Sequence, residues 1–494
     1  MPDDISVVFA SNRGPVAFVA TDDGFGTRDA AGGASPALHA VAKRLKDRAE
    51  WIAAAVSDAD RAAIAAGAGD ELSQRLGYDL YFLDIDPEMY HRYYNVVSNR
   101  MLWFANHCLW DEIDVPGFGA REVAAWEDAY EPVNKRFAEA IAETADLDAL
   151  VLFQDYHLAT APAHLRSLRP QQPIMHFTHS SFCGPEGLDH LPAPIPRAVI
   201  HGMLSADLVG FHVPPWAEGF FACCEAAGAR VDRDRGAVEH EGRTTWVRTY
   251  PIPVDPHGLR QRARGPKATE WAERCRSWAG DGALIVRADR AEPSKNIVRG
   301  FQAFAALLDR RPDLASKVRF AACLYPSRQD VPEYQDYTRQ IEEAVADVER
   351  KHPGSVEMFM KDDFDRTLGA YREYDILLVN SIMDGMNLVS KEGPALNERS
   401  GALVLSRGAG SYTELGEVAI EIPDAHDVEQ TSRALEEALE LSAAERKTRA
   451  DRLRAIVEST TPDDWIDRQI ADLAALRDNG APLTDPPRLG NKRA

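Results

Sequence analysis

Short runs of apolar residues alternate with longer amphipathic stretches through most of the chain. In the first half, runs of strand length occur at residues 5–10, 78–85, 149–153, 174–179, 208–213 and 246–252. Long helical patterns lie between them, for example at residues 37–49 and 126–143. Several runs are apolar at successive positions, which is typical of parallel strands covered by helices on both faces. The first half is therefore predicted to fold around a parallel sheet.

A stretch rich in proline and arginine, residues 251–266, interrupts this alternation and is predicted to be a linker. Beyond it, β-rich runs return at residues 283–287, 318–324, 376–379, 403–406 and 418–422. The pattern predicts an α/β protein with two Rossmann-like, doubly wound parallel-sheet domains that face a cleft. The predicted domains are residues 1–255 and 268–460, followed by a helix at residues 461–477 and a disordered tail at residues 478–494.

Composition narrows the functional class. The 494 residues carry 56 Lys+Arg and 78 Asp+Glu, and the net charge of −22 repels nucleic acid and anionic membranes at long range. No apolar run approaches the roughly 20 residues of a membrane span. The six cysteines include no CxxC pair, so neither a zinc site nor a disulfide scaffold is indicated. We expect a cytoplasmic enzyme without metal or cofactor; homo-oligomerisation is left open.

The strongest local signal is the segment 384–392, Asp-Gly-Met-Asn-Leu-Val-Ser-Lys-Glu, which follows a predicted strand and leads into a helix. Gly385 allows a tight turn, and the backbone N–H groups after it would point from a helix N-terminus toward a phosphate or a sugar hydroxyl. Those N–H groups belong to Met386, Asn387 and Leu388. Asp384 and Glu392 lie about two helical turns apart, a spacing that suits two polyols such as a sugar and a ribose. An N-cap aspartate and an exposed helical glutamate fit the spacing equally well.

A second cluster of charges follows the first strand of the second half. Arg290 and Lys295, five residues apart around Pro293, could converge on a diphosphate and neutralise the charge of a leaving nucleotide. Arg328, after the next strand, is a third candidate for binding an anion. Solvated surface charge is the alternative interpretation of the Arg290 and Lys295 cluster.

In the first half, polar residues again follow strands. Arg13 comes after the first strand, and Asp155 and His179 each end a later one, where functional side chains are expected in such sheets. Gly33, in a Gly-Gly pair, is weak evidence because it lacks the spacing of a dinucleotide fingerprint and the lysine of a P-loop. The aromatic residues Tyr94 and Trp103 are candidates for stacking on a sugar, although core packing is the more usual role.

Taken together and in order, these segments resemble the trehalose-6-phosphate synthases, glycosyltransferase family 20. The resemblance runs from about residue 11 to about residue 476. Besides the segment 384–392, it rests on four others: Ser11-Asn12-Arg13, Tyr94-Asn95 with Leu102-Trp103, Asp155-Tyr156-His157-Leu158, and Ser327-Arg328 with Asp330-Val331. It implies a GT-B fold in which the first domain binds the acceptor and the second binds the nucleotide-sugar donor.

The resemblance also implies the reaction and its residues. Glucose would pass from a nucleoside diphosphate glucose, UDP- or GDP-glucose, to glucose 6-phosphate with retention of configuration. The residues expected to hold the acceptor are Arg13, Trp51, Tyr94, Trp103 and Arg328. Those expected to hold the donor are Gly33, Asp384, Met386, Asn387, Leu388 and Glu392, the last on the ribose. Those expected to act in catalysis are Arg290, Lys295, His179 and Asp155. The leaving phosphate would itself take the acceptor proton, without the paired carboxylates of a glycosidase.

Some positions depart from the family pattern. The usual His-Ile-Pro-Phe-Pro is His179-Ser180-Ser181-Phe182-Cys183 here, and Met383 stands where an arginine usually precedes Asp-Gly-Met-Asn. Asn296 and the segment 397–399, Asn-Glu-Arg, resemble the validamycin-type pseudo-glycosyltransferases, which couple cyclitols. Three alternatives therefore stay open: a pseudo-glycosyltransferase, a synthase of another glucoside phosphate, and a non-catalytic nucleotide-sugar sensor.

Overall fold

The computed structural model describes residues 5–22, 24–29, 35–112 and 117–489. The chain divides into two compact units. The first unit contains Met1–Trp110, Pro116–Ile252 and Pro462–Ala494, and the second contains Asp111–Val115 and Pro253–Thr461. The C-terminal helix therefore belongs to the first unit.

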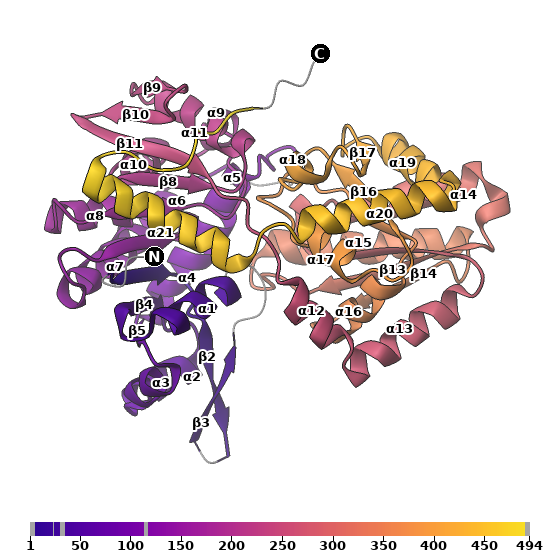
Figure 1. Ribbon diagram of the computed structural model, residues 1–494, viewed down its shortest axis with the longest axis horizontal. Helices are drawn as coiled ribbons and strands as arrows, with labels where there is room; N and C mark the ends of the chain where they lie inside the picture. Colours follow the sequence, from indigo (N-terminus) through magenta and orange to yellow (C-terminus); the bar gives the residue numbers. More distant parts are fainter. Residues whose placement is uncertain (1–4, 23, 30–34, 113–116, 490–494) are drawn as a thin grey trace. The chain divides into compact units, whose positions relative to one another are not determined.

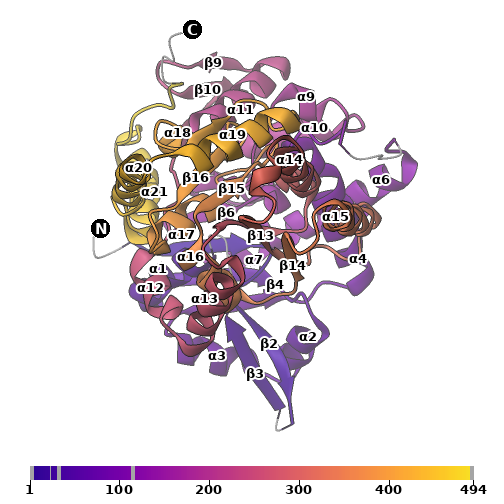
Figure 2. The same cartoon turned by 90° about the vertical axis from the view of Figure 1, so that its right-hand side faces the viewer.

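The first unit is built on a nine-stranded sheet of order β5-β4-β1-β6-β7-β8-β11-β10-β9. The strands are β1 (Val7–Ser11), β4 (Ala49–Ala54), β5 (Asp79–Leu83), β6 (Leu150–Gln154), β7 (Ile174–Phe177), β8 (Leu208–Phe211), β9 (Arg230–Asp232), β10 (Ala237–His240) and β11 (Arg243–Thr249). Strands from β5 to β11 in this order pair in parallel, and β10 and β9 continue the sheet in antiparallel. A separate hairpin, β2 (Val16–Thr21) and β3 (Gly24–Asp29), extends beside α2 (Figures 1 and 2).

Helices cover this sheet because its central strands are apolar on both faces. The α-helices of this unit are α1 (Ser35–Leu45), α2 (Asp58–Ala65), α3 (Ala68–Leu76), α4 (Pro87–His91), α5 (Trp103–Asn106), α6 (Ala120–Ala125), α7 (Glu131–Thr144), α8 (Ala161–Leu168), α9 (Pro185–Leu188), α10 (Ile195–Leu204), α11 (Pro214–Ala226) and α21 (Pro462–Asn479). The segments Arg92–Leu102 and Trp126–Tyr130 are wound as π-helices.

The C-terminal helix α21 packs against the N-terminal helix α1, as Figure 1 shows in yellow and indigo. Its Trp465 is buried and donates to the carbonyl oxygen of Tyr250 at 2.9 Å. Its Asp472 accepts the Tyr250 hydroxyl at 2.6 Å and the amides of Leu483 and Thr484 at 2.7 and 2.9 Å. The tail predicted to be disordered is thus ordered at these two residues, because a buried carboxylate binds their amides; residues 490–494 lie outside the described residues.

The second unit holds a six-stranded parallel sheet of order β14-β13-β12-β15-β16-β17. The strands are β12 (Ala283–Arg290), β13 (Val318–Tyr325), β14 (Val356–Met360), β15 (Ile376–Val379), β16 (Ala402–Ser406) and β17 (Ile420–Ile422). The α-helices are α12 (Pro256–Ala263), α13 (Pro266–Ala279), α14 (Ile297–Arg310), α15 (Pro332–Lys351), α16 (Phe364–Glu373), α17 (Val389–Leu396), α18 (Tyr412–Leu415), α19 (Val428–Glu440) and α20 (Ala443–Val457).

Each face of this sheet has its own apolar core. On β12, Leu284 and Val286 pack into one core together with α13, α16 and α20, whereas Ile285 packs into the other with α14, α15 and α19. Figure 2 shows α14 beside α19 and α13 beside α16. Complete burial of such a side chain contributes about 1.5–3 kcal/mol, which favours strands that are apolar at every position.

The predicted α/β class with parallel sheets is confirmed, but three local predictions differ from the structure. The supposed linker contains α12, a helix with one buried residue, Ala263, whose N-terminus is capped by Asp255. The strand β4 follows α1 almost directly and is rich in alanine, which hid it within a helical pattern. The hairpin strands and the strands β9, β10 and β14 were also missed. Within the described residues, no helix is long and apolar enough to cross a membrane.

Candidate functional site

In the second unit, the candidate residues gather at the carboxyl ends of three neighbouring strands. Arg290 ends β12, Arg328 follows β13, and Asp384 follows β15. Because β13, β12 and β15 are adjacent and parallel, their carboxyl ends meet at one edge of the sheet. Ligands of doubly wound sheets bind at this edge.

A buried carboxylate connects two of the predicted anion-binding residues. Glu292 is fully buried, and its Oε1 lies 3.1 Å from Arg290 Nε and 3.1 Å from Arg328 Nη1. Ser327 Oγ donates to the same oxygen at 2.7 Å. Burial alone would raise the pKa of Glu292, but the guanidinium groups of Arg290 and Arg328 outweigh it, helped by Lys295, and lower the pKa to about 2. Glu292 is thus ionised at neutral pH.

Lys295 forms an ion pair with Asp384. Burial would lower the pKa of Lys295, but the carboxylates of Asp384, Asp289 and Glu292 outweigh it and raise the pKa. The lysine therefore stays charged. The neighbouring Arg287 is fully buried. Its Nη2 donates to Asp289 Oδ2 at 2.8 Å and to the carbonyl oxygen of Lys295 at 3.0 Å. This second buried pair holds the turn that carries Lys295.

The turn after β15 presents unused backbone donors. Within the described part of the chain, the N–H groups of Met386, Asn387 and Leu388 donate to no protein acceptor. Asn387 has φ of +70° and donates to Asp384 Oδ2 at 2.9 Å. The loop from β16 supports this turn, since the Ser411 amide donates to the carbonyl oxygen of Met386 at 2.7 Å. A β-carbon at Gly410 would lie 2.2 Å from the carbonyl oxygen of Gly385, so the two loops can approach this closely only because position 410 is glycine.

Glu392 lies in the first turn of α17 and is separate from the ionic cluster. Tyr371 Oη donates to its Oε2 at 3.3 Å. Burial raises the pKa of Glu392 to about 7, and the Tyr371 hydrogen bond opposes this only in part. Its carboxyl group therefore changes charge close to neutral pH.

In the first unit, Arg13 and Tyr94 form a pair at the end of β1. Arg13 Nη2 donates to Tyr94 Oη at 3.0 Å, and the guanidinium lies 5.6 Å from the centre of the tyrosine ring. The Tyr94 ring stacks on His157, with 5.6 Å between ring centres. Trp103 is mostly buried and packs on His107 with ring centres 3.8 Å apart. Four of the predicted acceptor-binding residues, Arg13, Trp51, Tyr94 and Trp103, thus belong to this unit, whereas Arg328 belongs to the second.

Asp155 and His179 are joined at the ends of β6 and β7. Asp155 has φ of +70°, which is strained for a residue with a β-carbon and recurs at functional sites. Its Oδ1 accepts the His179 amide at 3.1 Å. Gln154 Nε2 donates to the carbonyl oxygen of Leu152 at 3.2 Å, so its Oε1 faces His179 Nε2 at 2.9 Å, a contact that fits the tautomer with the proton on Nε2. Burial, together with the nearby imidazoles of His212 and others, lowers the pKa of His179 well below its ordinary value. The imidazole is therefore neutral.

Two of the predicted substrate-binding residues, Trp51 and Gly33, have no described surface that a substrate could contact. Trp51 is fully buried in β4, where it packs on Phe9 and donates from Nε1 to Ser11 Oγ at 2.8 Å. In this structure it presents no surface to a sugar and instead supports the loop that carries Arg13. Gly33 lies outside the described residues.

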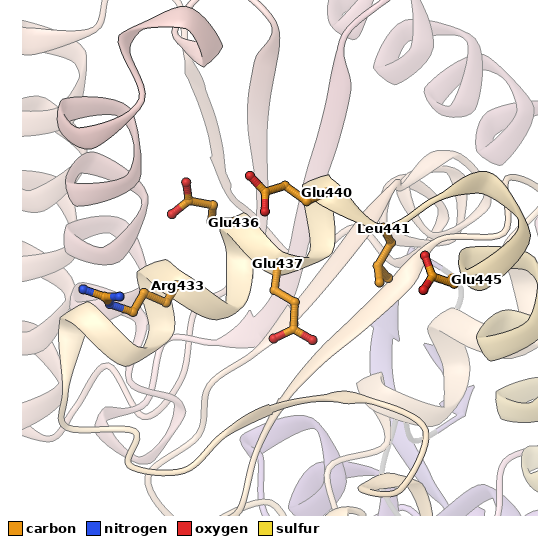
Figure 3. Close-up of a pocket in the computed structure, with 6 residues that line it drawn as sticks. All are labelled: Arg433, Glu436, Glu437, Glu440, Leu441 and Glu445. Carbon is orange, nitrogen blue, oxygen red and sulfur yellow. The ribbon is translucent and has the colours of Figure 1, made fainter.

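Other acidic groups of the molecule serve the fold. A surface hollow of about 390 Å³ on α19 and α20 is lined by Glu436, Glu440 and Glu445 among others. Figure 3 shows the side chains that line it. Glu436 pairs with Arg310 and Arg311, and Glu445 caps α20. These carboxylates are thus already engaged. Among the residues that the structure describes, no group of three or more His, Cys, Asp or Glu side chains is arranged to hold a metal ion.

Sequence reasoning missed Glu292 and gave no role to Ser327. Both lie near residues that it identified, but their role depends on Arg290 and Arg328, which follow different strands. The sequence signal that could have identified Glu292 is its position between the cationic residues Arg290 and Lys295.

The family model for glycosyltransferase family 20 matches residues 6–475. The chain belongs to glycosyltransferase family 20. Among curated relatives of this family 20 protein, a validamine 7-phosphate valienyltransferase from Streptomyces hygroscopicus is 31% identical over 86% of the chain and 85% of the relative. A trehalose-6-phosphate synthase from Mycobacterium sp. is 32% identical over 83% of the chain and 84% of the relative.

Solved structures of the family share its fold. An alpha,alpha-trehalose-phosphate synthase (UDP-forming) from Burkholderia vietnamiensis matches with a TM-score of 0.80 and 26% identity, covering 96% of this chain and 97% of that one. This likeness confirms the GT-B fold expected from the sequence, and the protein is a glycosyltransferase of the trehalose-phosphate synthase type.

One departure from the family pattern has a structural role in this family 20 protein. The Asn397 amide group donates to the carbonyl oxygens of Tyr371 and Tyr374, and its Oδ1 accepts the amides of Arg399 and Gly401. Asn397 thus caps the backbone at the end of α17.

Proposed function

We propose that this enzyme transfers glucose from a nucleoside diphosphate glucose to glucose 6-phosphate and forms α,α-trehalose 6-phosphate. The observation that carries the proposal is the convergence of Arg290, Lys295 and Arg328 at one sheet edge, beside the unused amides that follow Gly385. In a protein with a net charge of −22, such a cluster is suited to attract phosphorylated substrates.

On the donor side, Arg290 and Lys295 would hold the diphosphate. Among the described residues, the Nη atoms of Arg290 have no protein partner, and its side chain is 56% exposed, so they can reach a ligand. The amides of Met386 to Leu388 would bind glucose hydroxyls and phosphate oxygens. Glu392 would accept hydroxyl protons of the ribose.

On the acceptor side, Arg13 and Arg328 would bind the phosphate of glucose 6-phosphate, while Tyr94 and Trp103 would shape the sugar site. The hydrogen bond and stacking contact between Arg13 and Tyr94 orient both side chains before the substrate arrives. Such pre-orientation reduces the entropy lost on binding.

In the proposed reaction, the bond between donor C1 and the diphosphate oxygen breaks, and a bond from C1 to the acceptor O1 forms on the same face. The proton of the acceptor hydroxyl passes to the departing phosphate oxygen. Arg290 and Lys295 stabilise the charge that develops on that diphosphate. Neutral His179, with its proton on Nε2, would accept a donor hydroxyl at Nδ1, and Asp155 would hold it in place.

One observation favours a second candidate function. The Streptomyces valienyltransferase is as similar to this chain as the mycobacterial synthase is, and the segment 179–183 departs from the usual family sequence. In that case a valienyl group would replace glucose in the donor, with the same cations binding the diphosphate.

The test is a release assay with purified protein, glucose 6-phosphate and, in turn, UDP-, GDP- and ADP-glucose. Nucleoside diphosphate release and the product mass are followed. A disaccharide phosphate from one donor supports the proposal and identifies the base. Absence of product with all three, while a nucleotide-linked valienyl donor and validamine 7-phosphate do react, would favour the second candidate.

A further inference from the structure

Glu292 contacts two arginines, Arg290 and Arg328, that the proposed function assigns to different substrates. Its Oε1 contacts both Arg290, assigned to the donor diphosphate, and Arg328, assigned to the acceptor phosphate. Lys295, the other diphosphate ligand, adds to the positive potential at this carboxylate. Glu292 itself is fully buried, whereas the Arg290 side chain is 56% exposed. The buried carboxylate thus contacts Arg290 from the protein interior, while the rest of the Arg290 guanidinium is exposed.

The cost of burying Glu292 indicates a role other than stability. Its Oε2 is buried without a hydrogen-bond partner among the described residues. A buried ion-pair cluster can commonly be replaced as a whole by apolar side chains without loss of stability, so its presence is weak evidence for a stabilising role. Arg328 has φ of +43°, a strained backbone that its contacts with Glu292 and Tyr334 help to hold.

We propose that Glu292 is a positioning residue that orients Arg290 and Arg328 together, so that one buried charge sets the affinity for the phosphates of both donor and acceptor. The inference rests on the proposed function for the assignment of each arginine to its substrate. Without the carboxylate, the two guanidinium groups would repel each other and lose a shared charge-assisted contact.

The experiment measures binding by calorimetry on the full-length enzyme, with UDP and glucose 6-phosphate as probes. Glu292→Gln removes the charge and keeps the shape, and we expect the affinity for each probe to fall about tenfold. Uridine and glucose, which carry no phosphate, should bind both forms alike. Glu292→Asp, which keeps the charge, should recover most of the loss.

Asp375→Asn is the matched control. Asp375 is also buried and lies within 3.8 Å of three arginines, but it precedes β15 at the opposite edge of the same sheet. We expect it to lower the melting temperature and leave both affinities unchanged.

The inference is overturned if Glu292→Gln binds both phosphorylated probes as the wild type does, or if uridine and glucose lose affinity equally. Equal losses in Asp375→Asn would also overturn it. If Glu292→Gln does not fold, Ser327→Ala, which removes one hydrogen bond to Oε1, should still weaken both phosphate probes by about threefold. Binding needs no turnover, so failure of the release assay would refute the proposed function without refuting this inference.

Discussion

Replacing Lys295 by methionine separates stability from catalysis at the ionic cluster. The Lys295–Asp384 pair is nearly buried, since each side chain is 13% exposed. The substitution Lys295→Met would remove the cation that pairs with the Asp384 carboxylate. Asn387 Nδ2 at 2.9 Å and Ser381 Oγ at 3.4 Å also contact Asp384 Oδ2, and both groups are neutral.

The structure sets the expected magnitude. Breaking a buried ion pair by removing one partner costs about 3–5 kcal/mol, and the two neutral donors to Asp384 place this case near 3 kcal/mol. For a domain of about 150–250 residues, each kcal/mol shifts the melting temperature by roughly 2–4 °C. We therefore expect the second unit to melt about 6–12 °C lower. Because Lys295 would stabilise the leaving diphosphate, kcat should fall on the order of 10²–10³-fold.

The double variant Lys295→Met with Asp384→Asn distinguishes the two effects. It leaves no unpaired charge, so most of the stability should return, while kcat should stay as low as in the single variant. Calorimetric melting and the nucleotide-release assay measure the two quantities on the same samples. The reasoning is refuted if the double variant recovers wild-type kcat, or if Lys295→Met melts at the wild-type temperature.

Other substitutions test single parts of the site. Arg290→Ala should lower kcat on the order of 10²-fold, and near-normal turnover would remove Arg290 from its proposed role. Tyr94→Ala should raise the KM for glucose 6-phosphate and leave the Kd for UDP nearly unchanged; equal losses would contradict separate sites. The pKa of Glu392 is raised to about 7, so its carboxyl ionises as pH rises through neutrality; the donor KM should fall between about pH 6 and 8, and Glu392→Gln should flatten that profile. Gly410→Ala forces its β-carbon toward the Gly385 carbonyl oxygen and should weaken UDP binding, measured by calorimetry, more than glucose 6-phosphate binding.

Much of the fold could be predicted because the central strands are apolar on both faces. Strands β12, β13 and β15 follow continuous apolar runs, and each has residues in the two cores of the second unit. The strand β4 escaped prediction because the alanines on both sides of Trp51 favour a helix over a strand. The helix α12 escaped because its sequence has little apolar periodicity, and its N-cap, Asp255, was not recognised.

The site could be predicted only at the level of residues that follow strands. Asp155 and Arg290 are polar residues directly at strand ends, and Asp384 lies in the turn that follows β15, so the sequence itself marks their positions. The role of Glu292 depends on Arg328 reaching it from the neighbouring strand, and no local pattern contains that information. Trp51 shows the opposite error. It was expected to contact the acceptor, but its side chain is fully buried in the core beside β1.

The most direct test of the central claim is the structure of the product formed from glucose 6-phosphate and the accepted nucleotide-glucose. Proton NMR of the purified product reports both the linkage and the configuration at the two anomeric carbons. We predict a 1→1 linkage with both centres α, formed in equal amount with nucleoside diphosphate. A β centre at the transferred glucose, or nucleoside diphosphate released without any phosphorylated disaccharide, would contradict the account.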